Sequence, residues 1–313
     1  MKGKCLVLGG DGFLGSHLVD DLLLRGFFVR AFDRFEDGKM RNLIYPQKGL
    51  EIFSGDFLNV EDIEEALQGI DTVFHFISLG NPVLTIKDPE SDIKNNVLGT
   101  IRLLDACVKQ GIKKVIYPSS GGAIYGNVKG DCMREDSFLE PITPYSINKL
   151  CIEKYLSYYK KYYGLDCVIY RISNPYGERQ SADGTQGVIP ILLKKVLNEE
   201  VIDVYGNSVR DYIYIKDVTN FIADNFDKNH KYEVYNLGSG RPTSLEEVLL
   251  AIEKVTCSTP KKNQLERREF DVARIVLDVD RVKEEFHFTP TTDFIDGVQK
   301  TFDYIRHSIE QHN

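Results

Sequence analysis

The glycine-rich segment GGDGFLG at residues 9–15 restricts the fold of this chain more than any other feature. It follows the apolar run 5–8, which is typical of a buried strand, and it opens a helical pattern over residues 13–25 that Gly26 closes. A second strand is expected at residues 28–32. A strand, a glycine-rich turn, a helix and another strand form a βαβ unit, so the chain opens as an α/β protein.

The alternation of strands and helices continues through the first half of the chain. Further strands are expected at residues 51–53, 72–76, 114–117, 167–170 and 232–237, and helices at residues 62–68, 93–109 and 144–163. This order predicts an α/β fold with a Rossmann-like doubly wound parallel sheet. Beyond Arg171 the elements shorten, so we expect a dinucleotide-binding domain over residues 1–172. A smaller C-terminal α/β substrate domain is expected over residues 173–313, with segments near 210–240 able to pack back on the first domain.

Composition excludes several classes of partner. The net charge of -8 argues against a nucleic-acid-binding protein, and no apolar run reaches the roughly 18 residues needed to cross a bilayer. The six cysteines are far apart and form no C-x-x-C pair, so neither a disulfide framework nor a metal site is expected. We therefore expect a cytoplasmic protein whose substrate is a small molecule.

The glycine segment predicts a phosphate site. Gly9 and Gly12 allow the tight turn and the close approach of a pyrophosphate, while Gly15 allows the helix and the strand to pack closely. The backbone N–H groups of Phe13 and Leu14 lie at the start of the helix, where they can bind the anion. Glycine patterns also occur in ordinary turns, and the position after a strand and before a helix favours the dinucleotide site.

Asp33, at the end of the second strand, is the acidic residue expected to follow the glycine segment in a dinucleotide site. An acid in this place binds the adenosine ribose hydroxyls and repels a 2′-phosphate, so NAD is favoured over NADP. Arg34 follows directly and offers a guanidinium that is able to pair with a 2′-phosphate, which keeps NADP as the alternative.

A tyrosine followed four residues later by a lysine can form an unusual base, because on a helix the ammonium lies near the phenol and favours its ionised form. The pattern occurs three times: Tyr125/Lys129, Tyr145/Lys149 and Tyr212/Lys216. Gly126 indicates a loop after the first tyrosine, and the third pair lies in a predicted strand, which would separate the two residues by roughly 13 Å. Only Tyr145 begins a helix, so Tyr145 and Lys149 are the predicted catalytic pair.

Several segments, in order, resemble the extended short-chain dehydrogenase/reductase family and most closely its UDP-galactose 4-epimerase-like branch. They are GGDGFLG (9–15), GDFLN (55–59), HFIS (75–78), NNVLGT (95–100), SSGGAIYG (119–126), PYSINK (144–149), RISNPYGERQ (171–180) and VRDYIYIKDV (209–218). The resemblance implies NAD as cofactor and a homodimer formed through the helices near 93–110 and 145–163.

The resemblance also assigns the cofactor site. It implies that Asp56 and Phe57 contact adenine, that Phe76 and Ile77 line the cofactor groove, and that Asn95, Ser119 and Lys149 lie on the nicotinamide side. Asp56 is equally compatible with a turn acid and Phe76 with a core residue. His75 is taken as structural, because a histidine at the end of a strand is more often packed than catalytic.

In the second half, the resemblance implies that Asn174, Arg210 and Arg268 face the diphosphate of a nucleotide sugar, and that Tyr205 stacks on its base. Two arginines and an amide suffice for a diphosphate. Each arginine is equally well interpreted as a surface ion-pair partner. Ile275 falls where residue size controls tolerance of an N-acetyl group in the related epimerases.

One position departs from the family pattern. Gly121 occupies the place of the usual Ser or Thr, so either Ser120 supplies the catalytic hydroxyl, which we favour, or Tyr145 works with a water or the substrate alone. The next two residues are Gly122 and Ala123, where the related 4,6-dehydratases carry the Asp-Glu pair that removes water. Elimination of water therefore lacks its acid and base.

The resulting hypothesis is an NAD-dependent epimerase that inverts C4 of a UDP-hexose through a 4-keto intermediate, with Tyr145 as the base. The alternatives are a sugar-nucleotide 4-keto reductase or dehydrogenase, a UDP-glucuronate decarboxylase and, from another class, a non-catalytic NAD-sensing protein. The sequence leaves open which sugar is used and whether the nucleotide is UDP, dTDP or GDP.

Overall fold

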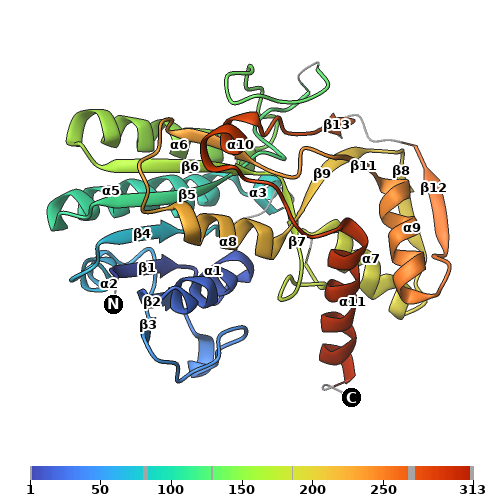
Figure 1. Cartoon of the computed structure of the whole chain (residues 1–313), viewed down its shortest axis with the longest axis horizontal. Coiled ribbons are helices and arrows are strands. Elements are labelled where there is room, and N and C mark those ends of the chain that lie inside the picture. The colour runs from blue at the N-terminus through green and yellow to red at the C-terminus, as the bar shows by residue number, and fades with distance from the viewer. Residues whose placement is uncertain (1, 80–83, 128–129, 185, 267–271, 311–313) are drawn as a thin grey trace. The chain divides into compact units, whose positions relative to one another are not determined.

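The structure is a computed structural model that describes residues 2–79, 84–127, 130–184, 186–266 and 272–310. A seven-stranded sheet has the order β10-β6-β5-β4-β1-β2-β3 (Figure 1). Its strands are β1 (Lys4–Leu8), β2 (Phe28–Asp33), β3 (Leu50–Ser54), β4 (Thr72–His75), β5 (Lys114–Ser120), β6 (Asp166–Ile172) and β10 (Val234–Leu237). β1 pairs in parallel with β2 and β4, so the strand order reverses beside β1, as it does in a doubly wound sheet. The predicted fold class is confirmed.

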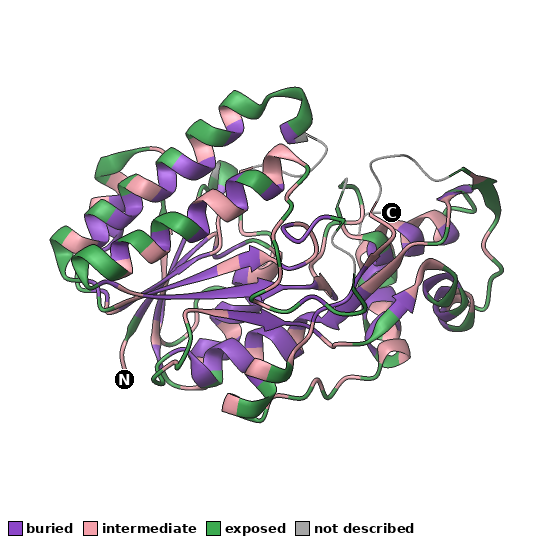
Figure 2. Ribbon diagram, turned by 90° about the horizontal axis from the view of Figure 1, so that it is seen from above, coloured by how far each residue is buried: buried purple, intermediate pink, exposed green. Residues whose placement is uncertain are grey.

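Helices cover both faces of this sheet (Figure 2). They are α1 (Phe13–Leu24), the short 3₁₀ helix η1 (Glu36–Gly38), α2 (Val60–Ala66), α3 (Leu84–Lys87), α4 (Pro89–Asp92), the π-helix η2 (Ile93–Leu98), α5 (Gly99–Gln110), α6 (Pro144–Tyr163) and α8 (Ile215–Asn225). On one face, the apolar sides of α2, α5 and α6 form a continuous core with the strands. On the other face, the Phe226 ring lies 5.1 Å from Phe27 and 5.0 Å from Phe74.

The second group of elements is smaller and centres on β9 (Val209–Tyr214). β9 pairs in parallel with β7 (Asn174–Tyr176) and β13 (Arg274–Ile275) and antiparallel with β11 (Pro242–Ser244). β8 (Ile202–Tyr205) and β12 (Lys262–Leu265) form a separate parallel pair. The helices are α7 (Val188–Leu197), α9 (Leu245–Thr256), α10 (Asp280–Phe286) and α11 (Phe294–Glu310), and α7, α9 and α11 pack against one another.

The chain divides into two compact units that are built from non-contiguous segments. The first comprises Met1–Ile124, Pro141–Arg171 and Thr219–Tyr235, and the second comprises Tyr125–Glu140, Ile172–Val218 and Asn236–Asn313. The functional division into a cofactor domain and a substrate domain stays a prediction.

Two local elements differ from the sequence interpretation. The strand expected through Lys216 ends at Tyr214, and α8 begins at Ile215 because Val218, Phe221 and Ile222 supply a helical apolar stripe. The helix expected over 93–109 is divided into the π-helix η2 and α5. Within the described residues, no helix combines the length and the apolar character that spanning a membrane requires.

Candidate active site

The glycine loop between β1 and α1 is packed so tightly that it tolerates no side chain at two positions. Gly9 has a φ of 79°, in the left-handed region that favours glycine. A Cβ atom on Gly10 would lie 2.8 Å from the Cβ of Ala31, and one on Gly15 would lie 2.0 Å from the carbonyl oxygen of Gly9. The glycines therefore allow the loop to pack directly against β2 and bring α1 close to the end of β1.

The first turn of α1 fits a phosphate. Its N-cap residue is Gly12, and no side chain makes a capping hydrogen bond there. The N–H groups of the first turn, which begins at Phe13 and Leu14, therefore have no side-chain cap, and their dipoles favour an anion. These residues fit the pyrophosphate of a dinucleotide.

Asp33 lies at the carboxyl end of β2, where an adenosine ribose is expected. Its carboxylate accepts hydrogen bonds from the backbone N–H of Asp11 at 3.1 Å and of Arg34 at 2.9 Å. The Arg34 guanidinium lies 3.4 Å from Asp56, and both side chains are about half exposed. Because such a surface ion pair is worth about 1 kcal/mol or less, Asp56 restrains Arg34 only weakly, and the roles predicted for these residues stay predictions.

Asp11 of the glycine segment has a structural role that the sequence interpretation missed. Its buried carboxylate accepts hydrogen bonds from the backbone N–H groups of Arg41 at 2.6 Å and of Asn42 and Leu43 at 2.9 Å. An aspartate is well suited to fix a loop in this way. It thereby ties the loop after β2 to the phosphate turn.

Some of the residues around the end of β4 are buried in the core, and others are partly exposed where the cofactor groove is predicted. Phe57 is only 5% exposed and stacks on His75 at a ring distance of 5.2 Å, so any ligand contact at Phe57 would use mainly its backbone. His75 binds Thr100 through Nε2 at 2.8 Å, and burial lowers its pKa to about 3, which agrees with a structural role. Phe76 and Ile77 are half-buried.

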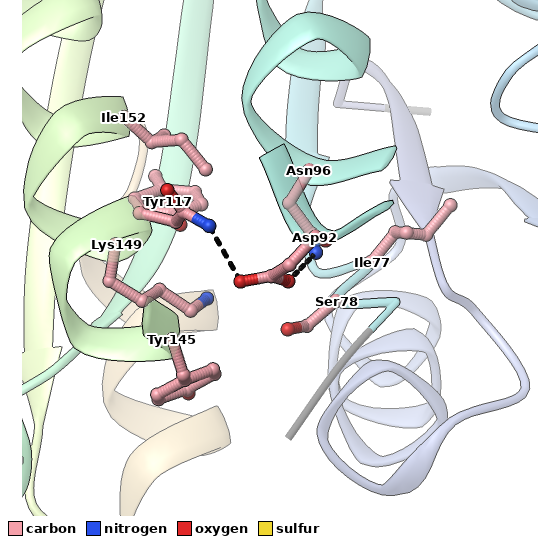
Figure 3. A pocket seen from close by; sticks show the side chains of 9 residues that line it. Ile77, Ser78, Asp92, Asn96, Tyr117, Tyr145, Lys149 and Ile152 are labelled. Atoms are coloured by element: carbon pink, nitrogen blue, oxygen red, sulfur yellow. Dashed lines mark hydrogen bonds between the residues drawn. The ribbon is translucent and has the colours of Figure 1, made fainter. Parts of the chain in front are cut away.

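The predicted catalytic pair lies on one face of the first turns of α6. Thr143 caps this helix, and Lys149 follows Tyr145 by one turn. The Lys149 Nζ atom donates to the carbonyl oxygen of Pro118 at 3.1 Å. It lies 4.7 Å from the ring centre of Tyr117 and 5.8 Å from that of Tyr145 (Figure 3). The lysine is buried, so its charge acts in a medium of low polarity.

The surroundings shift both pKa values of the pair. Burial raises the pKa of the Tyr145 phenol to about 12, while a hydrogen bond with Ser120 lowers it and the Asp92 carboxylate raises it. Burial lowers the pKa of Lys149 to about 8, against the carboxylates of Glu153 and Asp92, which raise it. In both groups burial favours the uncharged form, and pKa values shifted this strongly are common at catalytic sites.

The segment at the end of β5 places a hydroxyl beside the phenol. Ser120 is the last residue of β5, and its side chain is hydrogen-bonded to Tyr145, which supports the assignment of Ser120 as the catalytic hydroxyl. Ser119 is buried, and within the described part of the chain its Oγ atom has no hydrogen-bond partner. Gly121 lies in the turn that follows the strand.

A small cavity lies beside the predicted catalytic pair (Figure 3). It is lined by Ile77, Ser78, Asp92, Asn96, Tyr117, Tyr145, Asn148, Lys149 and Ile152. Asn96 reaches it, whereas Asn95, the residue that the resemblance assigns to the nicotinamide side, is half-buried and does not line it. The sequence interpretation also missed Asp92 and Asn148, because acids and amides are common on the exposed faces of helices.

The other two tyrosine-lysine patterns have different surroundings. Tyr125 is fully buried, and its hydroxyl donates to the side chain of Asn236 at 2.6 Å. Lys129 lies outside the described residues. Tyr212 is in β9, whereas Lys216 is in α8, so no helix face joins that pair.

Two of the predicted substrate residues lie on neighbouring strands of the second unit. Asn174 on β7 donates to the backbone carbonyl of Asp211 at 2.9 Å. The guanidinium of Arg210 on β9 donates to the carbonyl oxygens of Val209 at 2.9 Å and Val272 at 2.7 Å. Both side chains are half-buried, and their contacts with a diphosphate stay predictions.

The remaining predicted substrate residues are less informative. Tyr205 is the half-buried last residue of β8. Ile275 pairs with Arg210 across β13 and β9 and is only 2% exposed. Arg268 lies outside the described residues.

A parallel sheet whose order reverses at β1, with an uncapped glycine turn at that point, defines a dinucleotide-binding protein of the Rossmann type. The second feature of the site is the tyrosine-lysine pair on α6, which is the predicted base. The model of the NAD-dependent epimerase/dehydratase family matches residues 5–238.

Curated relatives cover nearly the whole chain. A UDP-glucose 4-epimerase of Mycolicibacterium smegmatis is 30% identical over 97% of this chain and 98% of its own length. A dTDP-4-dehydro-6-deoxyglucose reductase of Escherichia coli is also 30% identical, over 97% of this chain and 98% of its own length.

Solved structures agree with the same family. A UDP-glucose 4-epimerase of Thermotoga maritima, solved with UDP-glucose, has a TM-score of 0.91 and 32% identity, and the match covers 98% of this chain and 99% of that one. A UDP-glucose 4-epimerase of Thermus thermophilus, solved with NAD, has a TM-score of 0.88 and 34% identity, with 97% and 99% covered.

The chain therefore belongs to the NAD-dependent epimerase/dehydratase family. This confirms the resemblance found in the sequence and the prediction of NAD as cofactor.

We expect the protein to bind NADH more tightly than NADPH, because the Asp33 carboxylate repels a 2′-phosphate. Asp33→Asn keeps an acceptor for the Asp11 N–H but removes the charge, so the preference should shrink by about tenfold. Fluorescence titration with both reduced nucleotides measures it. Glu36→Gln removes an exposed carboxylate from the same loop and serves as the control. A wild-type preference for NADPH would contradict the role given to Asp33.

Proposed function

We propose that this protein interconverts UDP-hexoses that differ in configuration at C4, through a 4-keto intermediate and with Tyr145 as the catalytic base. The observation that carries the proposal is the Tyr145 phenol, hydrogen-bonded to Ser120 and one helical turn from the buried ammonium of Lys149. The UDP-glucose 4-epimerases that are 30 to 34% identical over nearly the full chain support it.

The residues of the chain divide the work of proton transfer. Tyr145 takes the proton of the 4-hydroxyl, Ser120 holds the same oxygen, and Lys149 stabilises the phenolate by its charge. NAD, when bound, would supply the acceptor and donor of the hydride, and its positive charge would favour the phenolate. Tyr145 then returns its proton to the oxygen of the inverted centre, so that the protein ends in its starting state.

The loop after β5 favours inversion over dehydration. Gly122 and Ala123 occupy the places where a dehydratase needs an acid and a base. Neither residue has a side chain that exchanges protons, so these two positions supply neither the acid nor the base that removes water. A reductase of a 4-keto nucleotide sugar remains the second candidate, because the E. coli reductase is as similar as the M. smegmatis epimerase.

The proposal is tested with a panel of UDP-hexoses, UDP-hexuronates and their dTDP counterparts, with products resolved by ¹H NMR. We expect a mixture of two C4 epimers from a UDP-hexose, with no net change in absorbance at 340 nm. Stoichiometric consumption of NADH on a keto sugar would instead identify a reductase, and release of carbon dioxide would identify a decarboxylase.

Loss of the phenol should almost abolish turnover. Tyr145→Phe is expected to lower kcat by about 10³-fold or more, because it removes the base, and Ser120→Ala by about 10- to 100-fold, because it removes a hydrogen bond that favours ionisation. Both variants should still bind NAD, which NADH fluorescence measures.

The matched control is Tyr163→Phe, which removes an exposed phenol from the last turn of the same helix and should leave kcat unchanged. Wild-type kcat in Tyr145→Phe would refute the mechanism, and wild-type kcat in Ser120→Ala would refute the assignment of the hydroxyl.

We also infer that the chain forms a homodimer through α5 and α6. Exposed side chains of Ile147, Tyr155, Tyr158 and Tyr162 follow one stripe of α6 at helical spacing, and Leu98, which directly precedes α5, is also exposed. A stripe of this kind on a helix pair is suited to a four-helix contact with a second copy.

Sedimentation equilibrium should give twice the mass of the 35.7 kDa chain. Tyr158→Glu places a charge in the stripe and should shift the protein to the monomer, whereas Tyr304→Glu, at an exposed tyrosine on α11, should not. A monomeric wild-type protein at micromolar concentration would contradict the inference.

A further inference from the structure

Asp92 is a buried carboxylate that the proposed chemistry does not use. It is the last residue of α4, is only 4% exposed, and lines the cavity beside Tyr145 and Lys149 (Figure 3). No lysine or arginine in the described part of the chain forms an ion pair with it. Burying a carboxylate costs free energy unless hydrogen bonds and a nearby positive charge compensate for the lost hydration.

Both oxygens of Asp92 accept hydrogen bonds from amide side chains. Oδ1 accepts from Asn96 Nδ2 at 2.6 Å, and Oδ2 accepts from Asn148 Nδ2 at 2.6 Å. Asn148 directly precedes Lys149 on α6, so the carboxylate bridges the helix of the catalytic pair to the π-helix η2.

The bridge continues to the cofactor side of the sheet. The side-chain oxygen of Asn96 accepts the backbone N–H of Leu79, in the segment that follows β4. Asn96 lies in η2, and π-helical turns of this kind occur frequently at functional sites because they redirect side chains. One carboxylate therefore links α6, η2 and the segment after β4 through a continuous chain of hydrogen bonds.

Asp92 also differs from the other carboxylate near the pair in having no cationic partner among the described residues. The other carboxylate near the pair, Glu153, is neutralised by Arg171, whose Nη2 lies 2.8 Å from Glu153 Oε2, and both side chains are buried. Two uncharged titratable groups lie close to the pair. Tyr117 on β5 lines the cavity, and burial raises its pKa; His75 on β4 packs against the Tyr117 ring, and burial lowers its pKa to about 3. Asp92 is thus the carboxylate beside the pair whose charge no contacting arginine or lysine offsets in the described residues.

We propose that Asp92 is a positioning residue for Tyr145 and Lys149, which fixes α6 against the segment after β4 and supplies a negative charge beside the pair. The inference rests on the proposed function of that pair. It assigns the carboxylate a task besides packing: it keeps Lys149 charged and sets the pH range in which the pair works.

The sign of the effect follows from the charges. A negative charge disfavours loss of a proton from both groups, so it raises the pKa of Tyr145 and of Lys149. Without that charge, both groups lose their protons at lower pH. Because the two groups titrate as a coupled pair, both limbs of the pH profile of kcat should move toward acid.

Asp92→Asn tests the charge while it preserves the shape. The new amide can accept from Asn96 and donate to Asn148 after the Asn148 side chain turns over, so all hydrogen bonds are retained. We expect both limbs of the kcat profile to move to lower pH by on the order of one unit. Limbs that stay at the wild-type pH, with only the height of the profile changed, would overturn the proposal.

Two further variants separate charge from position. Asn148→Ser removes the bridge and keeps the carboxylate, and should lower kcat about three- to tenfold with the limbs unmoved; a wild-type kcat would refute the positioning role. The exchange Asp92→Asn with Asn148→Asp restores one carboxylate and all hydrogen bonds, so it should return the limbs toward wild type. Limbs that stay displaced would refute the role of the charge.

The control variant is Asp105→Asn, which removes the charge of another carboxylate in contact with α6. This carboxylate accepts a 2.6 Å hydrogen bond from the Tyr159 hydroxyl, far along the helix from the pair. It should leave both limbs unchanged. A shift as large as that of Asp92→Asn would overturn the assignment.

A readout without turnover distinguishes this inference from the proposed function. NMR titration of ¹³Cε-labelled lysine in the NAD complex follows Lys149, assigned by its loss in Lys149→Arg. The pKa should fall in Asp92→Asn even if the wild-type protein epimerises no UDP-hexose. An unchanged Lys149 pKa in a variant of an active epimerase would refute the inference and leave the function intact.

Discussion

The buried ammonium of Lys149 is the constraint on which the rest of the site depends. Taking an isolated ammonium out of water costs several kcal/mol, and the fold offsets this cost with groups from different elements. β5 provides the Pro118 carbonyl at 3.1 Å and the face of Tyr117 at 4.7 Å, and α4 provides the Asp92 carboxylate. The cation is stable only while these elements keep their positions, so the catalytic geometry and the packing of the sheet depend on each other.

The sequence predicted those parts of the fold that follow from local rules. Alternating strands and helices gave the parallel sheet, and the glycine segment gave the phosphate turn, because each of these signals lies in one short stretch. Tyr145 was separated from two other tyrosines by its helical context, and the structure agrees that Tyr212 and Lys216 share no helix.

The parts that the sequence could not predict depend on contacts between distant segments. Asp92 lies in the acidic stretch KDPESD, which has the composition of an exposed helix start, and only the approach of Asn148, 56 residues later, shows it to be buried. In the π-helix at 93–98 it is Asn96, not Asn95, that lines the cavity. No residue pattern in the sequence predicts a π-helical turn. The role of Asp11 was missed for the same reason: its hydrogen-bond donors lie in a loop about 30 residues away in the sequence.

The glycine at position 121 is compatible with the proposed role of Ser120 as the catalytic hydroxyl. Ser120 ends β5, whereas Gly121 lies in the turn beyond it, so moving the hydroxyl back by one residue places it on the strand. The same strand end already holds the carbonyl of Pro118 against Lys149, two residues earlier. One rigid element thus positions the partner of the lysine and the partner of the phenol, and sites built on strands are held more precisely than sites on loops.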